Sequence, residues 1–142
     1  MKLNRRLFVS GGLVGAVSPV MLHAVPASAA GDVEAISQLS GKLFYTSEAP
    51  GRWAGKEGGH APMIERSANA IEITTGHEMD GYNHYIVKHA LLDADLKFVT
   101  ETMFDPEKDT PVSQHSIKGL SGPLYALSLC NKHDLWLTSF TL

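Results

Sequence analysis

The sequence predicts an all-β protein, an antiparallel β-sandwich of about seven strands. Short runs in which apolar and polar residues alternate recur along the 142 residues, and Gly, Pro, Asp and Asn gather between them. Only residues 33–39 keep a helical period for about two turns. Short alternating runs separated by turn residues are typical of stacked antiparallel sheets.

The first thirty residues are expected to be a cleaved export signal. A basic start with Arg5 and Arg6 precedes an apolar stretch at 7–22, and small residues follow up to Ala29 and Ala30, where we expect cleavage. The paired arginines resemble the twin-arginine signal, which exports folded proteins, so we expect a periplasmic or other extracytoplasmic location. A membrane anchor and an ordinary secretory signal are the alternatives; the apolar stretch is short and interrupted by Gly and Pro.

Residues 31–142 are expected to form a single domain, because they suffice for one core and are too few for two. Residues 1–30 hold three basic residues and no acidic one, so the domain keeps 9 of the 12 basic residues against all 15 acidic ones, a net charge of -6. Such an acidic domain is a poor partner for nucleic acid or anionic membranes. We therefore expect no nucleic-acid partner, and no stable membrane span after cleavage.

The elements of this domain follow in order. Residues 50–62 are rich in glycine and predict an exposed loop. Residues 70–75 alternate apolar and polar side chains before Gly76, which predicts a half-buried strand. The same pattern predicts four further strands, at 85–92, 96–103, 124–130 and 135–142. The last two form a hairpin with residues 131–134 at its tip, which brings Cys130 and His133 to one end of the sandwich.

Cysteine and histidine carry the chemical signal. The single cysteine excludes an intramolecular disulfide and any multi-cysteine metal site within the chain. Cys130 and His133 lie three residues apart across the hairpin tip, close enough to bind one metal ion. The alternative is a buried structural cysteine beside a surface histidine. His60 follows two glycines in a loop that can fold over an ion, and His77 and His84 flank a loop rich in Gly, Asp and Asn.

Three segments that contain these residues resemble the signatures of a known family. Residues 58–65 read Gly-Gly-His-Ala-Pro-Met-Ile-Glu, residues 77–79 and 84–86 read His-Glu-Met and His-Tyr-Ile, and residues 130–136 read Cys-Asn-Lys-His-Asp-Leu-Trp. In the same order, the superoxide reductases (desulfoferrodoxin iron domains and neelaredoxins) carry a Glu-Lys-His-(Val/Ala)-Pro loop, a His-Pro…His-(His/Tyr)-Ile segment and a terminal Cys-Asn-x-His-Gly-x-Trp.

The resemblance implies an immunoglobulin-like sandwich holding one mononuclear non-haem iron per chain. The planar ligands would be His60, His77, His84 and His133, and the axial ligand would be the thiolate of Cys130. Backbone amides of residues 131–133 would donate hydrogen bonds to the sulfur. The implied activity is that of a superoxide reductase, the one-electron reduction of superoxide to hydrogen peroxide with electrons from an unidentified donor. Family members are commonly dimers or tetramers, so a homo-oligomer is expected.

Two departures from the family concern the first two motifs. Gly58-Gly59 replaces the family's Glu-Lys pair, whose lysine attracts the anion. Lys56 and Glu57 lie two residues further back, and with a shifted register they would be the catalytic residues. The spacing from His77 to His84 is seven instead of six, which the extra Gly81 would absorb as a wider loop.

Two further departures concern charge. Lys88 replaces an expected tryptophan and would either supply a positive charge near the iron or face solvent. Asp134 replaces a glycine; aspartate tolerates the turn but would repel superoxide. His89 and His115 match no ligand and are interpreted as ordinary strand or loop histidines.

Two other functions stay open. A cupredoxin-like electron-transfer protein also clusters Cys and His at a final hairpin, but it needs a weak axial ligand such as methionine after the last histidine, where Leu-Trp-Leu stands at 135–137. A non-catalytic iron-binding or redox-sensing member of the family is suggested by the Gly58-Gly59 substitution.

Overall fold

The computed structural model describes residue 34 and residues 37–142. The expected export signal lies outside the described residues, and the predicted helix at 33–39 falls partly outside them. Within the described part of the chain, no helix is long and apolar enough to cross a membrane.

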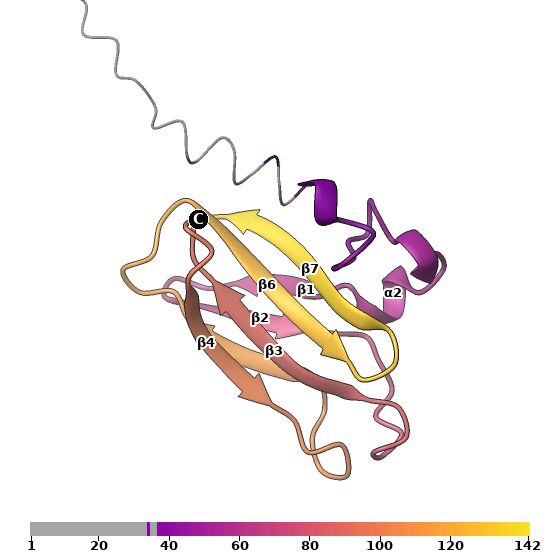
Figure 1. The fold of residues 1–142 in the computed structure, drawn as a ribbon. Helices are drawn as coiled ribbons and strands as arrows, with labels where there is room; N and C mark the ends of the chain where they lie inside the picture. The colour runs from indigo at the N-terminus through magenta and orange to yellow at the C-terminus, as the bar shows by residue number, and fades with distance from the viewer. Residues whose placement is uncertain (1–33, 35–36) are drawn as a thin grey trace, which may run out of the picture.

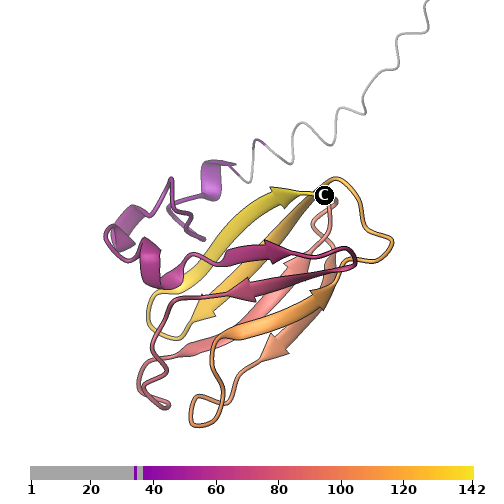
Figure 2. The same ribbon diagram turned by 180° about the vertical axis from the view of Figure 1, so that it is seen from behind.

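Seven strands form two antiparallel sheets that pack face to face (Figures 1 and 2). One sheet has the order β1-β2-β5, built from Met63–Arg66, Ala70–Thr74 and Val112–Ser116. The other has the order β4-β3-β6-β7, built from Phe98–Met103, Ile86–Leu92, Pro123–Cys130 and Asp134–Thr141. The predicted antiparallel β-sandwich of about seven strands is confirmed.

Two of the seven strands were not predicted by the alternation of apolar and polar residues. β1 is four residues long, and its side chains are mostly exposed, so it lacks an apolar face. β5 alternates between exposed and buried side chains, but its buried positions are Ser113 and His115. A strand whose inward residues are polar gives no hydrophobic period. The other five strands lie where they were predicted, within two residues at each end.

The main core lies between the sheets. Ile71 and Ile73 of β2 pack with Leu91 of β3 and with Leu124 and Ala126 of β6. β6 alternates strictly, so that positions 124, 126, 128 and 130 all point into the sandwich. Cys130 is therefore the last inward residue of β6, at the end where the strand turns toward β7. That end lies opposite the C-terminus (Figure 1).

The glycine-rich segment before β1 covers this end of the sandwich. It contains a short 3-10 helix, η1 (Gly51–Trp53), and a single helical turn, α2 (Glu57–His60). Six of the thirteen residues at 50–62 are exposed, but the segment ends in three buried residues, His60, Ala61 and Pro62. The prediction of an exposed loop is thus wrong for this end, where α2 turns His60, only 4% exposed, inward beside the buried Trp136 of β7.

Candidate metal centre

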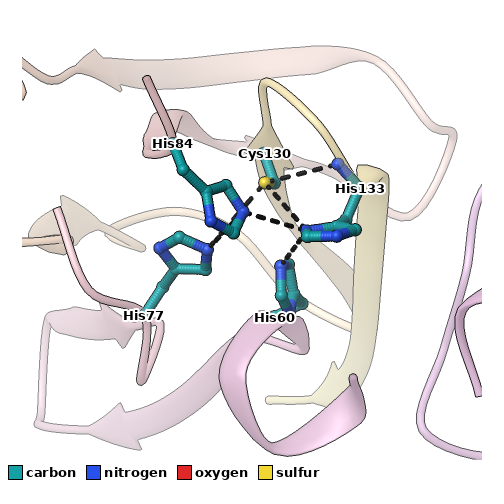
Figure 3. A group of neighbouring side chains, drawn as sticks. All are labelled: His60, His77, His84, Cys130 and His133. Atoms are coloured by element: carbon teal, nitrogen blue, oxygen red, sulfur yellow. Dashed lines mark hydrogen bonds between the residues drawn. The ribbon is translucent and has the colours of Figure 1, made fainter. Parts of the chain in front are cut away.

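Five side chains from four separate segments converge at this end of the sandwich. His60 ends α2, His77 follows β2, His84 precedes β3, and Cys130 and His133 flank the β6–β7 turn. One ligand atom from each lies within 4.8 Å of every other. Figure 3 shows the four imidazole rings and the thiol directed toward one another. The structure thus brings together all five residues that the sequence singled out as metal ligands.

Asn131 holds two of these segments together. Its side-chain Oδ1 accepts a hydrogen bond from Tyr85 N at 3.0 Å, and its Nδ2 donates to Asn83 O at 3.2 Å. Its backbone N–H also donates to Tyr85 O at 3.1 Å. These bonds fix the turn that carries His84 against the hairpin that carries Cys130. Sequence analysis named Asn131 only as a backbone donor; its position next to the cysteine was the available signal.

Backbone carbonyls set the tautomers of two histidines. Nδ1 of His60 lies 2.8 Å from Lys56 O, and Nδ1 of His77 lies against Glu78 O. A carbonyl only accepts, so each Nδ1 carries the proton, and the neutral ring leaves a lone pair on Nε2. Both Nε2 atoms point into the cluster (Figure 3). Carbonyl partners of this kind commonly orient histidines that bind metals.

The spacing of the nitrogens fits a metal ion. Along the series from His77 to His84, His133 and His60, consecutive ring nitrogens are 3.0, 3.0 and 2.9 Å apart. Two nitrogens at right angles around an ion, each about 2.1 Å from it, are about 3.0 Å apart. Lone pairs that meet this closely repel one another unless a cation or protons lie between them. The donor set of four imidazoles and one thiol therefore suits a transition-metal ion.

The sulfur of Cys130 lies beside these nitrogens in a buried position. It is 3.6 Å from His133 Nδ1 and 4.0 Å from His77 Nε2, and Cys130 is 2% exposed. The backbone N–H groups of Lys132 and His133 each donate to the sulfur at 3.4 Å. Of the amides at residues 131–133 that were expected to donate to the sulfur, those of Lys132 and His133 do so, whereas that of Asn131 donates to Tyr85 O. Such bonds stabilise a thiolate and adjust the redox potential of a metal that it binds.

Three histidines of the cluster, His60, His84 and His133, favour their neutral form. Burial lowers the pKa of His60 to about 4, and the hydrogen bond to Lys56 O opposes that shift only in part. Burial also lowers the pKa of His84 and of His133, and neighbouring positive charges, including those of Lys56 and Lys132, lower both further. Neutral imidazole is the form that binds metal ions.

Two lysines place positive charge next to the cluster. Lys56 immediately precedes α2, and Lys132 lies in the β6–β7 turn, where its Nζ donates to Asn83 Oδ1 at 3.0 Å. Both charges lower the pKa of His84 and of His133, in addition to the larger effect of burial. Sequence analysis missed Lys132, although its place between Cys130 and His133 was a signal. Glu57 begins α2, so it lies one helical turn before His60.

Asp134 does not present a free negative charge to the site. It adopts a left-handed conformation, with φ 62°, as the tight turn requires. Its carboxylate pairs with Arg52 and accepts a hydrogen bond from Trp53 Nε1 at 2.9 Å, and these bonds lower its pKa. The expected repulsion of superoxide is therefore offset by Arg52. The ring of Trp53 in turn packs edge-on against His133, at 4.6 Å between centroids.

Lys88 lies away from the cluster. In the β3–β6 register it is opposite Leu129, on the outer face of the sheet, whereas Cys130 points inward. Its Nζ pairs with Glu101 at 2.8 Å. Of the two interpretations of Lys88, the structure supports the solvent-facing one.

Comparison with known proteins gives similarity at the level of structure. A single-residue variant of the superoxide reductase (neelaredoxin) from Ignicoccus hospitalis is 25% identical, with a TM-score of 0.63 over 72% of this chain and 94% of that chain. A second variant of the same protein is 26% identical, with a TM-score of 0.60 over the same shares. A superoxide reductase (1Fe-SOR) from Giardia intestinalis, 21% identical, matches in fold, with a TM-score of 0.52 over 61% of this chain and 100% of that chain.

No protein-family model matches the sequence, and no curated protein matches it. The structural similarity and the geometry of the five side chains nevertheless agree. This chain has the fold of superoxide reductases of the neelaredoxin type, at low sequence identity, and carries at one end of it a His/Cys cluster suited to a metal ion.

Proposed function

We propose that this protein is a superoxide reductase with one mononuclear non-haem iron per chain, bound by His60, His77, His84, His133 and Cys130. The observation that carries the proposal is the convergence of four imidazole nitrogens and one sulfur within 4.8 Å. The structural similarity to superoxide reductases at 25 and 26% identity supports it.

When bound, a ferrous ion would supply the one electron that superoxide accepts, and two protons from water complete hydrogen peroxide. The protein's own contribution is to bind and tune that ion. Neutral imidazoles suit ferrous iron, and the sulfur of Cys130, with its two backbone donors, is prepared to act as a thiolate. An electron donor, not identified here, would restore the ferrous state.

We propose Lys56, Glu57 and Lys132 as the catalytic residues. The charges of Lys56 and Lys132 act on His84 and His133, so they would draw an anion toward the cluster despite the net charge of the domain. Glu57 would act from the first position of α2, one turn before His60, as a carboxylate near the metal.

The cellular setting is also a proposal. We propose that residues 1–30 direct export of the folded protein by a twin-arginine-like route to the periplasm or another extracytoplasmic space. There residues 31–142 would act as a homo-oligomer, a dimer or tetramer, without nucleic acid or a membrane span. An extracytoplasmic reductase would meet superoxide before it reaches other exported proteins.

The proposal is tested by loading the purified protein with iron and mixing the ferrous form rapidly with superoxide. We expect one iron per chain, an absorption band from sulfur to ferric iron that bleaches on reduction, and hydrogen peroxide formed in proportion to the iron oxidised. If the ferrous protein does not react with superoxide, the alternative of a non-catalytic iron-binding or redox-sensing protein would be favoured. A protein that selects copper over iron would favour the cupredoxin-like alternative.

A further inference from the structure

A chain of polar side chains crosses the sandwich between the apolar core and the His/Cys cluster. Its five members are all at most 5% exposed and come from both sheets: Thr75, His89, Ser113, His115 and Ser128. None belongs to the cluster of metal ligands. We call this set the buried polar chain.

Hydrogen bonds connect its members without a break. His89 is the centre: its Nε2 lies 2.9 Å from Thr75 Oγ1, and its Nδ1 lies 2.8 Å from Ser113 Oγ. Thr75 Oγ1 continues to Ser128 Oγ at 2.8 Å, and Ser113 Oγ continues to His115 Nε2 at 2.8 Å. A hydroxyl donates one proton and accepts others, so each of these four contacts can be satisfied with both rings neutral. The Nδ1 of His115, at the end of the chain, is buried and has no partner among the described residues.

Stability alone does not account for this polar layer. At the same level of the sandwich, inward positions of the neighbouring strand β2 are filled by apolar side chains, since Ile73 pairs with Ser113 and Ile71 pairs with His115. Apolar side chains of similar volume are often as stable as a buried polar network or more so. Hydrogen bonds differ in being directional, so a satisfied network fixes the relative position of the segments that it joins.

The segments joined by the buried polar chain are the ones that carry two of the ligands. Thr75 lies two residues before His77, whose N–H donates to Thr75 O at 2.8 Å. Ser128 lies two residues before Cys130 on the same inward face of β6. The hydrogen bond between Thr75 and Ser128 therefore ties together, directly beneath the cluster, the segments that carry His77 Nε2 and Cys130 Sγ, which are 4.0 Å apart.

We propose that the buried polar chain positions His77 relative to Cys130, so that Thr75, His89 and Ser128 are positioning residues for the metal ligands. The inference rests on the proposed metal centre. The inference goes beyond that centre by assigning a role to residues that do not touch the ion. Loss of hydrogen bonds that orient ligands commonly weakens metal affinity about 10-fold to 100-fold.

The test uses Co²⁺ as a spectroscopic probe with the full-length protein. Thr75→Val keeps the shape of the side chain but removes the hydroxyl, Thr75→Ser restores it, and Thr74→Val is the matched control at the neighbouring, half-buried threonine. We expect Thr75→Val to bind Co²⁺ about 10-fold more weakly and to shift the sulfur-to-cobalt absorption band. Thr75→Ser should restore both, and Thr74→Val should match the wild type.

Ser128→Ala removes only the last hydroxyl of the buried polar chain. It is the variant to use if Thr75→Val does not fold. It should shift the band in the same direction. A lower melting temperature with unchanged Co²⁺ affinity and an unchanged band, in either variant, would overturn the positioning role and leave a purely structural one. So would failure of Thr75→Ser to restore the wild-type spectrum.

These measurements do not use superoxide. A wild-type protein that binds Co²⁺ but, loaded with iron, does not reduce superoxide would contradict the proposed function, while the variants still decide the positioning role. A wild-type protein that binds no Co²⁺ would overturn the metal centre and this inference together.

Discussion

This molecule contains two groups of histidines whose ring nitrogens contact different kinds of atom. In the cluster at the end of the sandwich, ring nitrogens face other ring nitrogens at 2.9 to 3.0 Å, and backbone carbonyls fix the protons of His60 and His77 on the far side of the ring. In the interior, the rings of His89 and His115 face the hydroxyls of Ser113 and Thr75.

The difference teaches what makes a buried histidine a ligand. A hydroxyl can either donate or accept, so both ring nitrogens of His89 and the Nε2 of His115 have partners within the protein, whereas the buried Nδ1 of His115 has none among the described residues. A ring whose Nδ1 proton is held by a carbonyl offers only a lone pair on Nε2, and this lone pair needs a proton or a cation from the group that it meets. Burial alone does not identify a ligand, because His60 is about as buried as His89 and His115 while the other three cluster histidines are half-buried; the chemistry of the neighbouring atom does.

The largest expected effect is on the sulfur ligand. Cys130→Ser should abolish the sulfur-to-iron absorption band, because the hydroxyl that replaces the thiol gives no such transition. The measurement is the visible spectrum of the oxidised, iron-loaded variant, with circular dichroism to show that the fold is kept. A band that survives in a folded Cys130→Ser protein would show that Cys130 is not the ligand.

The interior group predicts a dependence of stability on pH in the metal-free protein. Burial lowers the pKa of His89 to about 4, with the nearby His115 adding to the shift, against an ordinary value of 6.5. Between these values the unfolded chain binds more protons than the folded one. The free energy of unfolding should therefore fall as the pH is lowered from about 6.5 to about 4, with His89 contributing on the order of 3 kcal/mol.

Urea unfolding at a series of pH values measures this contribution. His89→Gln keeps hydrogen-bonding atoms but does not titrate, so its stability should depend less on pH than that of the wild type. Equal pH dependence in the two proteins would mean that His89 is not held neutral by burial.

A cluster histidine should affect metal binding more than stability. His60→Ala removes one nitrogen donor, and we expect iron affinity to fall about 100-fold, at the upper end of the range for altered metal sites. Competition with a chelator gives the affinity. Ile117→Ala, at a residue of the apolar core that is as buried as His60, is the control, and an equal loss of affinity there would show that the loss in His60→Ala comes from general destabilisation.

The smallest effect concerns the approach of the anion. Lys56→Ala should slow the reaction with superoxide a few-fold and reduce its dependence on ionic strength, because an exposed positive charge near the site is screened by salt. Lys88→Ala should leave the rate unchanged, since Lys88 pairs with Glu101 on the outer face of the sheet. Stopped-flow rates at several salt concentrations decide this, and equal salt dependence in all three proteins would exclude steering by Lys56.

Much of this molecule could be predicted from local patterns. Alternation of apolar and polar residues placed five strands, and the turn at 131–134 placed Cys130 beside His133. β5 was not predicted, because its inward residues are Ser113 and His115, which give no hydrophobic period. These two residues belong to the buried polar chain, so the strand that was missed and part of the network that was not foreseen have one cause.

The sequence by itself determined the period of the strands and the turns between them, because each of these depends on residues close together in the chain. It indicated the five metal-binding side chains through three ordered motifs that resemble those of superoxide reductases. Only the tertiary structure decided which atoms meet. The pairing of Arg52 with Asp134, the carbonyl behind each of two cluster histidines, and the outward direction of Lys88 follow from the register and packing of the segments. Contacts across tens of residues depend on how the sheets stack, and no local period records that arrangement.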